Sequence, residues 1–483
     1  MILNLFKRNN LILPLHFLIV MVFFLSINGY TQNSNISEGW LVVPSSQHPS
    51  IPSAISDANE GDTIYVLNGT YLLENIGYCA SNAAICFDGK NITIMGESRE
   101  ETILDASELV NMDVIGFYNE VNPTTNAKFQ SFTIINGNYT GAGRSGICVT
   151  DGNVAYLEDI RIIDMYSSGQ GPAIFINKNS TTEISNCILT DNESGNNGGA
   201  IFIEESTVNI YNSNISSNES NGNGGGIHIR NNSNVQIYNS VIKYNESNIG
   251  NGGGIYLDTN SSIDISFSTI SNNKSTGSNQ GGGIYLENSI ANVINCHINF
   301  NEAQTGGGIS ITNGSDISIY EYSINYLEEN NLDYNYYSST INNNIAIRDA
   351  GGININNDGD NNIEVLNTEI MNNVSGGVDV NQNPTNGHGG GIRIQGGNLD
   401  ITNSKIHNNS AVTGGGFHVG GPSSINLNFT EITNNTGSND GGAFVQGDAT
   451  INLTNVTIAN NNGNNPDIYI NTGNNVNFLN SII

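Results

Sequence analysis

Cationic side chains are scarce in this sequence. Its 483 residues contain 14 Lys and Arg against 44 Asp and Glu, which gives a formal net charge of −30. A surface of that charge repels nucleic acid and anionic glycans unless cations bridge them. We therefore expect no nucleic-acid partner. The acidity indicates solubility in salty surroundings or, alternatively, a requirement for calcium.

Long apolar segments are absent beyond the N-terminus. Lys7 and Arg8 precede the run LILPLHFLIVMVFFLSI, and a small and polar stretch around Gly29 follows it. This order predicts a secretory signal peptide over residues 1–32, with an uncleaved membrane anchor as the alternative. No later segment has 18 consecutive apolar residues, so we expect no membrane span in the mature chain. The expected location is secreted or cell-surface, which includes association with an outer membrane.

Residues typical of metal and nucleophilic centres are sparse as well. Five cysteines and seven histidines are spread over the chain, without a nucleophile triad, a phosphate loop or a Cys/His metal cluster. Cys79 and Cys86 are close enough in sequence to close a small disulfide loop. We expect no cofactor, with calcium as the alternative.

Glycine and asparagine are abundant and form a repeat. The stretch GGGIHIRNNSNVQIYNSVIKYN at residues 224–245 recurs along the chain, and a second apolar alternation follows the first in each copy. Such a unit supplies two or three short strands and no helical period, so it must stack on its neighbours. The residues after the glycines, most of them 25 to 29 positions apart, are Ile147, Ile174, Ile201, Ile227, Ile255, Ile284, Ile309, Ile353, Ile392, Phe417 and Phe444.

Two columns follow the second strand of each copy. Stacked Asn side chains that turn inward can satisfy one another, and Phe can replace Asn by stacking. The first column is Asn186, Asn212, Asn239, Phe267, Asn295, Asn367, Asn403, Phe429 and Asn455. The second, six residues further, is Asn192, Asn218, Asn245, Asn273, Asn301, Asn373, Asn409, Asn435 and Asn461. An inward slot between them holds Cys187 and Cys296 four coils apart, roughly 19 Å, too far for a disulfide.

These patterns predict an all-β chain folded as a right-handed parallel β-helix solenoid with internal Asn ladders. Glycines at the corner permit positive φ and close approach of the backbone before the next strand. The expected organisation is the signal peptide over 1–32, an N-terminal cap and first coils over 33–135, and the repeat region over 136–483. Insertions at 322–340 and 375–388 interrupt the repeat.

The repeats resemble those of a known superfamily. GGAI at 198–201 and GGGI at 224–227, with the I-x-x-N close, are similar to the right-handed β-helix proteins of the pectin-lyase-like superfamily. They most resemble the GGAI and FxxN repeats of polymorphic outer-membrane proteins, although Ile mostly stands here where those have Phe. The resemblance, from about residue 48 to the end, implies a surface or secreted protein, either an adhesin or a polysaccharide-cleaving enzyme. The sequence lacks a C-terminal membrane barrel and the dense Asp and Arg signatures of the enzyme branch.

Outward columns on the GGGI strands are the predicted ligand surface. Aromatic rings beside charged groups predict a sugar-binding track, since rings stack on sugars and charged groups hydrogen-bond to their hydroxyls. The alternative is that these side chains merely cover an exposed sheet. The predicted ligand contacts on these strands are Phe202, His228, Arg230, Tyr256, Asp258, Tyr285 and Glu287. Catalytic candidates among them are Arg230, Asp258 and Glu287, the last two as a carboxylate pair.

The insertions add further candidates. Tyr334, Tyr336 and Tyr337 lie in the insertion 322–340 and are predicted ligand contacts, because a long loop on a rigid solenoid is free to acquire function. Its alternative is a tolerated insertion without a role. A calcium site is the second interpretation of NNDGDNN at 356–362, after an Asx-rich turn. Its ligands would be Asn356, Asp358, Asp360 and Asn362.

We therefore expect a non-enzymatic adhesin or glycan-binding protein whose partner is a polysaccharide or a cell-surface glycan or receptor. The alternative is a polysaccharide lyase or glycoside hydrolase acting along the outward face of the GGGI strands. The terminal stretch NVNFLNSII stops before its closing Asn, which leaves an incomplete last coil. We expect a missing C-terminal anchor or sorting domain, or a partner, to cover that coil, with a frayed but tolerated end as the alternative.

Overall fold

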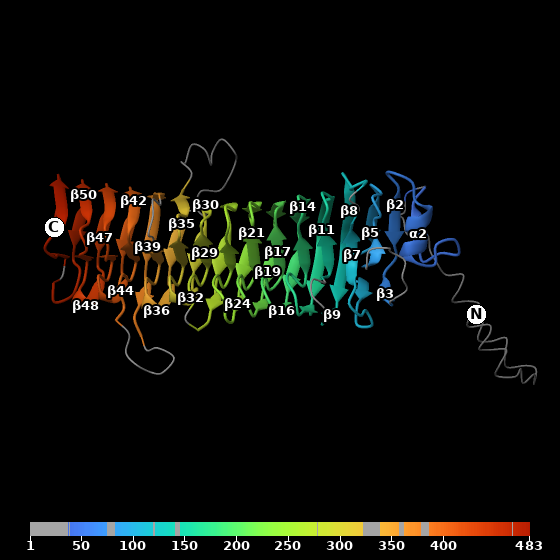
Figure 1. Ribbon diagram of the computed structural model, residues 1–483, viewed down its shortest axis with the longest axis horizontal. Coiled ribbons are helices and arrows are strands. Elements are labelled where there is room, and N and C mark those ends of the chain that lie inside the picture. Colours follow the sequence, from blue (N-terminus) through green and yellow to red (C-terminus); the bar gives the residue numbers. More distant parts are fainter. Residues whose placement is uncertain are drawn as a thin grey trace, which may run out of the picture.

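Each sequence repeat forms one coil of a right-handed parallel β-solenoid (Figure 1). The computed structural model describes residues 37, 39–74, 83–118, 121–140, 145–277, 279–321, 339–356, 362–377, 386–465 and 467–483. The predicted signal peptide lies outside these ranges. Three parallel sheets of 28, 14 and 11 strands run along the solenoid, called here sheets A, B and C. Within the described ranges, no helix has the length and apolarity needed to cross a membrane.

Most strands of sheet B follow a glycine corner. From the strand that begins at Ile147 onward, the first residue of each strand belongs to the inward apolar column, and the register pairs it with its counterpart in the next coil, as in Ile227 with Ile255. The strands are β4 (Ala83–Cys86), β7 (Asp113–Phe117), β10 (Ile147–Val149), β13 (Ile174–Ile176), β17 (Ile201–Glu204), β21 (Ile227–Arg230), β25 (Ile255–Leu257), β29 (Ile284–Glu287), β33 (Ile309–Thr312), β37 (Ile353–Asn356), β41 (Ile392–Gln395), β45 (Phe417–Val419), β49 (Ala443–Val445) and β52 (Ile468–Ile470).

Sheet A usually takes two strands from each coil, separated by a bend. Apolar residues at alternate positions point into the solenoid, as the period of two requires. The strands are β1 (Leu41–Val43), β2 (Thr63–Val66), β3 (Gly69–Leu72), β5 (Thr93–Gly96), β6 (Thr102–Asp105), β8 (Ala127–Ile135), β11 (Val154–Ile163), β14 (Thr181–Ser185), β15 (Ile188–Thr190), β18 (Thr207–Tyr211), β19 (Asn214–Ser216), β22 (Asn234–Tyr238), β23 (Val241–Lys243), β26 (Ser262–Ser266), β27 (Thr269–Ser271), β30 (Ile290–Ile294), β31 (His297–Asn299), β34 (Asp316–Tyr320), β35 (Ser339–Asn342), β38 (Asn362–Leu366), β39 (Thr368–Met371), β42 (Gly397–Thr402), β43 (Lys405–His407), β46 (Ser423–Asn428), β47 (Glu431–Thr433), β50 (Thr450–Thr454), β51 (Thr457–Ala459) and β53 (Asn475–Leu479).

Sheet C is the narrowest and leads into the glycine corner. Its strands are β9 (Asn138–Tyr139), β12 (Tyr166–Ser167), β16 (Glu193–Ser194), β20 (Glu219–Ser220), β24 (Glu246–Ser247), β28 (Lys274–Ser275), β32 (Glu302–Thr305), β36 (Ile345–Asp349), β40 (Val374–Ser375), β44 (Ser410–Thr413) and β48 (Thr436–Asp440). The short helix α2 (Ile51–Asp57) lies at the N-terminal end of the solenoid (Figure 1) and contacts β1, β2 and β4.

The predicted second Asn column is an internal ladder. Nδ2 of Asn273 donates to Oδ1 of Asn301 over 3.0 Å and to the carbonyl oxygen of Ile242 over 2.9 Å. Its own Oδ1 accepts from both nitrogens of Asn245. Buried polar groups that are fully paired in this way stabilise a single register. The ladder also includes Asn344, which sequence analysis missed because the insertion displaces it; Asn344 bonds Asn301 and the next Asn of the column.

The first Asn column lies mostly on the outside, which corrects the expectation that both columns are internal. Asn186, Asn239 and Phe429 have φ of 55°, 47° and 51°, because this residue turns the chain between the two sheet A strands of a coil. Asn tolerates this left-handed conformation, and the side chain then faces solvent. Nδ2 of Asn239 donates to Oδ1 of Asn212 over 2.7 Å, so part of this column forms an external ladder. Phe429 is 61% exposed.

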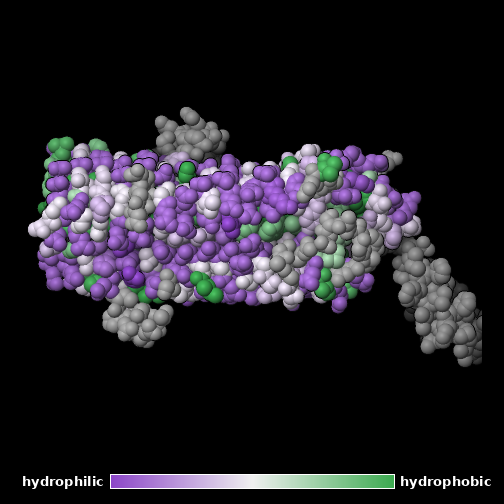
Figure 2. All heavy atoms as spheres, in the orientation of Figure 1, coloured by the Kyte–Doolittle hydropathy of each residue, from purple (hydrophilic) through white to green (hydrophobic). Residues whose placement is uncertain are grey.

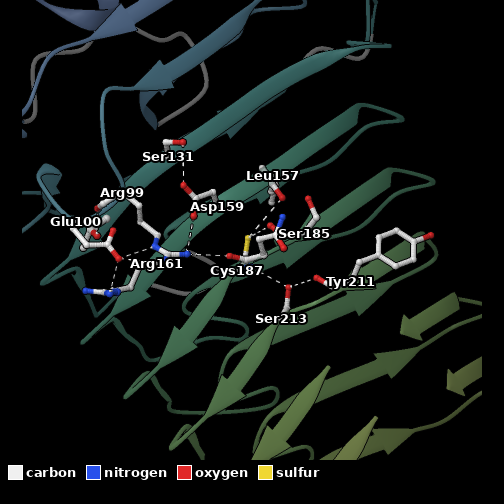
Figure 3. A network of polar contacts seen from close by, with 12 residues as sticks. Arg99, Glu100, Ser131, Leu157, Asp159, Arg161, Ser185, Cys187, Tyr211 and Ser213 are labelled. Atoms are coloured by element: carbon white, nitrogen blue, oxygen red, sulfur yellow. Dashed lines mark hydrogen bonds and ion pairs between the residues drawn. The ribbon is translucent and has the colours of Figure 1, made fainter. Parts of the chain in front are cut away.

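The inward slot between the columns holds small side chains. Cys187 and Cys296 are free, buried thiols, and burial raises the pKa of each to about 12. The N–H of Cys187 donates to Oγ of Ser213 in the next coil (Figure 3). The prediction that these cysteines do not pair is confirmed. Cys86 is disulfide-bonded, whereas its predicted partner Cys79 lies outside the described residues.

An ion network links the early coils across sheet A. Nη1 of Arg99, in the turn after β5, lies 2.7 Å from Oδ1 of Asp159 on β11, and Arg99 and Arg161 both contact Glu100 (Figure 3). Oγ of Ser131 donates to the same Asp159 carboxylate. Arg99 and Arg161, two of the few cationic residues of the chain, therefore link early coils of the solenoid.

One predicted repeat position is wrong by one residue. Ala443, not Phe444, pairs with Phe417 in the inward column, because the corner before β49 has one residue fewer than the corner before β45. Phe444 consequently stands in the outward column, where its ring stacks on His418 with centroids 5.2 Å apart.

The surface of the solenoid is mostly hydrophilic on the face shown in Figure 2, and apolar residues gather at its C-terminal end. Phe478, Leu479, Ile482 and Ile483 in and after β53 are exposed. The sequence-based expectation of a covering domain or partner stays a prediction.

Candidate functional site

The glycine corners determine what sheet B shows to solvent. The first glycine of most corners has positive φ, 69° at Gly252, and its backbone folds back over the following strand; at the corner before Ile353, Ala350 takes this conformation, with φ of 53°. A Cβ added to Gly252 would lie 2.9 Å from Cβ of Tyr256 and 2.5 Å from the carbonyl oxygen of Ile255. The same contact recurs at Gly281 over Tyr285. The corner therefore covers the column that follows the inward Ile.

The predicted aromatic track is consequently buried. Phe202, His228, Tyr256 and Tyr285 are only 1 to 5% exposed, although their side chains point away from the solenoid interior. Their rings contact one another from coil to coil: Phe202 and His228 meet edge-on with centroids 5.3 Å apart, and the two tyrosines stack with centroids 5.2 Å apart. The expected open platform for sugar rings is therefore absent in this conformation, because the corner backbone lies over it.

The neighbouring column of charged residues is half-buried. Nε of Arg230 lies 3.5 Å from Oε1 of Glu204, and Nε2 of His228 lies 3.4 Å from Oδ2 of Asp258. Burial lowers the pKa of His228, so its imidazole is neutral at physiological pH. Burial alone would raise the pKa of Asp258, but the neighbouring His228 and Arg230 outweigh it and lower that pKa.

The two carboxylates of the predicted catalytic pair have separate partners. Asp258 contacts His228 and accepts from Oγ1 of Thr259, whereas Glu287 accepts from the Tyr256 hydroxyl over 2.8 Å. Burial and then Glu287 raise the pKa of Tyr256, so this hydroxyl remains protonated. Glu287 also accepts from Asn313. Each carboxylate is thus engaged in its own local group, and their pairing as catalytic acid and base stays a prediction.

A denser charged cluster lies at a corner closer to the C-terminus, three coils after the coil of Asp258. The carboxylate of Asp349, at the end of β36, is 6% exposed and lies 2.8 Å from Nδ1 of His388, 3.3 Å from Nε of Arg348 and 3.5 Å from Nε of Arg393. His388 pairs with Asp349 across adjacent coils in the position before the glycine corner. We call Arg348, Asp349, His388, Arg393 and His418 the Asp349 cluster.

Electrostatics within the Asp349 cluster favour one protonation pattern. Burial opposes ionisation of Asp349, but the hydrogen bond from His388 and the nearby Arg393 lower its pKa overall. His418, whose ring centroid lies 4.8 Å from that of His388, has its pKa lowered to about 3 by burial and by the charges of His388 and Arg393. The carboxylate is therefore charged and His418 neutral at physiological pH.

The arrangement leaves one imidazole partly accessible. Because an ionised carboxylate only accepts hydrogen bonds, Nδ1 of His388 donates to Asp349. The side chain of His388 is 33% exposed and that of Arg348 is 62% exposed, so these two side chains are the parts of the cluster that a ligand can reach. Arg393 donates to Asn354 and Gln395 on the same sheet B face, which holds its guanidinium in place.

The remaining predicted residues are only partly described. Tyr334, Tyr336, Tyr337, Asp358 and Asp360 lie outside the described residues. Of the other calcium candidates, Asn356 is exposed at the end of β37, and the N–H of Asn362 donates to Oδ1 of Asp316 over 2.7 Å. In the described part of the chain, no group of three or more His, Cys, Asp or Glu side chains is arranged to hold a metal ion.

Sequence analysis did not select Asp349 and His388 as site residues. They stand in the column that precedes the glycines, together with Gln280, Thr305 and Thr413. That column was readable from the repeat, but the insertion 375–388 places the two members of the pair 39 positions apart in the chain. Arg393 and His418 belong to the outward column, whose burial the sequence did not reveal.

Comparison with known protein families finds the same architecture. A family described as right handed beta helix region matches residues 120–279 and 225–386, together more than half of the chain. The Azotobacter vinelandii mannuronan C-5 epimerase AlgE6 A-module is similar in structure, with 16% identity over 84% of this chain and 93% of that chain and a TM-score of 0.46. The catalytic domain of a GH87 alpha-1,3-glucanase, a D1069A variant in complex with tetrasaccharides, is similar over 92% of this chain and 69% of that one, with 13% identity and a TM-score of 0.34. No curated protein matches the sequence.

Proposed function

The chain belongs to the right-handed β-helix family, and from that premise we propose that it is a secreted or cell-surface glycan-binding protein. The proposed ligand lies across the corner between sheets C and B, where the Asp349 cluster and the half-buried charged column share one side of the solenoid. Export rests on the N-terminal pattern of Lys7, Arg8 and the apolar run.

The convergence of two guanidinium groups and an imidazole on Asp349 carries this proposal. A chain with a net charge of −30 offers few places where a sugar carboxylate or a row of hydroxyls meets positive charge. Arg348, Arg393 and His388 meet at one carboxylate, and Arg348 is 62% exposed. Guanidinium and imidazole groups bind carboxylates and hydroxyls directionally. Glycans with acidic residues therefore fit this corner best, and Arg230 extends the same face.

A binding screen tests the proposal. Polygalacturonate, alginate and neutral polysaccharides would be titrated with and without calcium against the full chain and against Arg393→Gln and Arg230→Gln. We expect an acidic polysaccharide to bind and Arg393→Gln to weaken it by about tenfold. Lys405→Gln is the matched control, because this cation is 54% exposed on β43 of sheet A, away from the corner. Equal binding by Arg393→Gln and Lys405→Gln would contradict the proposed location.

The Asp349–His388 pair also favours a second candidate function, cleavage or modification of the bound glycan. A carboxylate that fixes the tautomer of an imidazole leaves Nε2 as a general base. Nδ1 of His388 lies 2.8 Å from the carboxylate, and the side chain is partly exposed. Under this alternative, Asp258 and Glu287 are the other candidate acid and base groups.

The two functions separate in one experiment. The same polysaccharides would be incubated with the chain and the products followed by chromatography and by absorbance of unsaturated sugars. Products that form with the full chain and vanish with His388→Gln, while binding persists, support an enzyme. His407→Gln, on β43 of sheet A, is the control. Binding without products for every polysaccharide supports the non-enzymatic proposal.

A further inference from the structure

A hollow on sheet A lies outside the corner described above. It has a volume of ≈ 360 Å³, within the range of about 300–1,000 Å³ for ligand sites in proteins. Its walls come from β18, β22, β26, β30 and β34, five consecutive coils in sheet A. None of the residues of the Asp349 cluster lines it.

The register explains the shape of this hollow. Tyr238, Ser266, Ile294 and Tyr320 follow one another in a single outward column of adjacent strands. Ser266 is small and Ile294 is 7% exposed, so the middle of the column is low and a tyrosine stands at either end. Three coil spacings separate the two tyrosines, about 14 Å. The ring of Tyr238 is also held edge-on against Phe267, with centroids 5.4 Å apart.

The adjacent column supplies a polar edge. Gln236, Asp264 and Asn292 are in register on β22, β26 and β30. Nδ2 of Asn292 donates to Oδ1 of Asp264 over 2.7 Å, which orients both groups along the hollow. In such a row the carboxylate accepts hydrogen bonds from hydroxyl groups, and the amides both accept from them and donate to them. The edge therefore matches a ligand with many hydroxyl groups.

The charge of the lining residues favours a neutral sugar over an anionic one. The lining includes one carboxylate, Asp264, and no Lys, Arg or His. An anionic sugar would face Asp264 without a cation to offset the repulsion, on a chain with a net charge of −30. A neutral sugar has no such penalty, and its apolar ring face packs on the tyrosines.

We propose that this hollow is a binding subsite for a neutral glycan, separate from the corner site. Tyr238 and Tyr320 hold the sugar chain at its two sides, and Gln236, Asp264 and Asn292 bond its hydroxyls. This subsite extends along the solenoid axis, so a linear glycan lies across successive coils. The inference stands independently of what the corner binds, because no side chain is common to the two sites.

Calorimetric titration of the full chain tests this inference. The probes are cello-, xylo-, manno-, malto- and laminari-oligosaccharides, with oligogalacturonate as the acidic comparison. At least one neutral oligosaccharide is expected to bind, and Tyr238→Ala and Asn292→Ala are each expected to weaken it by about tenfold or more. Tyr238→Phe keeps the ring and is expected to bind like the parent.

Two control variants test whether the neutral glycan binds in the hollow. Tyr156→Ala removes a half-buried tyrosine from β11, on the same sheet but outside the hollow, and is expected to leave the affinity unchanged. Arg393→Gln tests the corner and is also expected to leave neutral-glycan binding unchanged, so failure of the corner proposal is distinguishable. The inference is overturned if no neutral probe binds, if binding survives both Tyr238→Ala and Asn292→Ala, or if oligogalacturonate is the ligand lost in Tyr238→Ala.

Discussion

Nδ1 of His388 lies 2.8 Å from Oδ1 of Asp349, although the two residues are 39 positions apart in the chain. The stacking of adjacent coils brings the pair together, and Arg393 completes the group from the next strand of sheet B. Asp349 is therefore a buried carboxylate that contacts three cationic or imidazole side chains.

Replacement of Asp349 tests how far stability depends on this group. Asp349→Asn leaves Arg393, whose side chain is only 14% exposed, without its counterion. We expect the free energy of unfolding to fall by about 3 kcal/mol, the lower end for breaking a buried pair, because Arg348 and His388 are partly exposed. Denaturant titration measures it. Asp164→Asn, an exposed position with φ of 56°, is the matched control and should change stability by less than about 0.5 kcal/mol.

Stability should depend on the protonation of His418. Folding lowers the pKa of His418 to about 3 from an ordinary value of 6.5, so the unfolded chain binds a proton that the folded chain does not. This residue therefore destabilises the fold progressively as the pH falls from about 6.5 towards 3. The pKa of Asp349 is lowered as well, so its stabilising contribution is lost as the pH falls below about its ordinary value of 3.8, and this loss adds to the effect of His418.

The His418→Phe variant is expected to lose less stability on acidification than the parent, because it removes that proton uptake while preserving stacking on Phe444. The groups facing position 418 are His388, Arg393 and Asp349, and they remain in the variant. Unfolding free energies at about pH 7.5 and pH 4.5 provide the comparison. His407→Phe, half-buried on sheet A, is the control. Equal acid losses in His418→Phe and the parent would refute the assignment.

Replacement of a single Asn of the internal ladder should lower the free energy of unfolding. Asn273→Ala removes the acceptor of two Asn245 nitrogens and the donor to Asn301 and Ile242, all of them buried. We expect a loss of at least about 3 kcal/mol, because each unsatisfied buried group costs about 1–3 kcal/mol. Thermal or denaturant unfolding reports it. Asn234→Ala, exposed at the start of β22, should be nearly neutral, and a similar loss at both positions would argue against the ladder as the source of stability.

The insertion after β34 can be removed in register. Oγ of Ser339 donates to the carbonyl oxygen of Tyr320 over 2.8 Å, as Oγ of Ser240 does to Tyr238 with one residue between them. Deletion of residues 322–338 with Glu321→Asn therefore restores the regular bend. We expect unchanged folding, measured by circular dichroism and thermal unfolding.

The same deletion tests the predicted role of Tyr334, Tyr336 and Tyr337. If these tyrosines recognise a ligand, glycan binding should weaken while the fold persists. Unchanged affinity for every glycan that the full chain binds would assign the insertion no role in recognition.

Much of the architecture was predictable because it is local and periodic. The alternation around Ile227, the Gly corner and the Asn at position 245 each report a backbone requirement that recurs in every coil. The inward slot of Cys187 followed from counting residues within the repeat. Two errors arose where the count changed: the short corner before Ala443 and the insertion before Asn344 each displaced one position. The mostly outward first Asn column is a third error, because its left-handed φ at the bend turns the side chain to solvent.

The candidate sites were less predictable. Alternation correctly placed Tyr256 and Tyr285 outside the interior, but it carried no information about the corner backbone that covers them. Asp349 and His388 are neighbours only because two coils stack in register across an insertion. The hollow beside Tyr238 likewise depends on the small Ser266 one coil away and on Tyr320 three coils away.

The sequence by itself determined a parallel β-helix with an internal Asn column, because hydrophobic period, turn residues and ladder residues all act within one coil or between adjacent copies. The tertiary structure alone decided which outward side chains are exposed and which charges meet. That outcome depends on how each corner folds over the next strand and on how insertions alter the stacking of distant residues, and neither is encoded in the repeat itself.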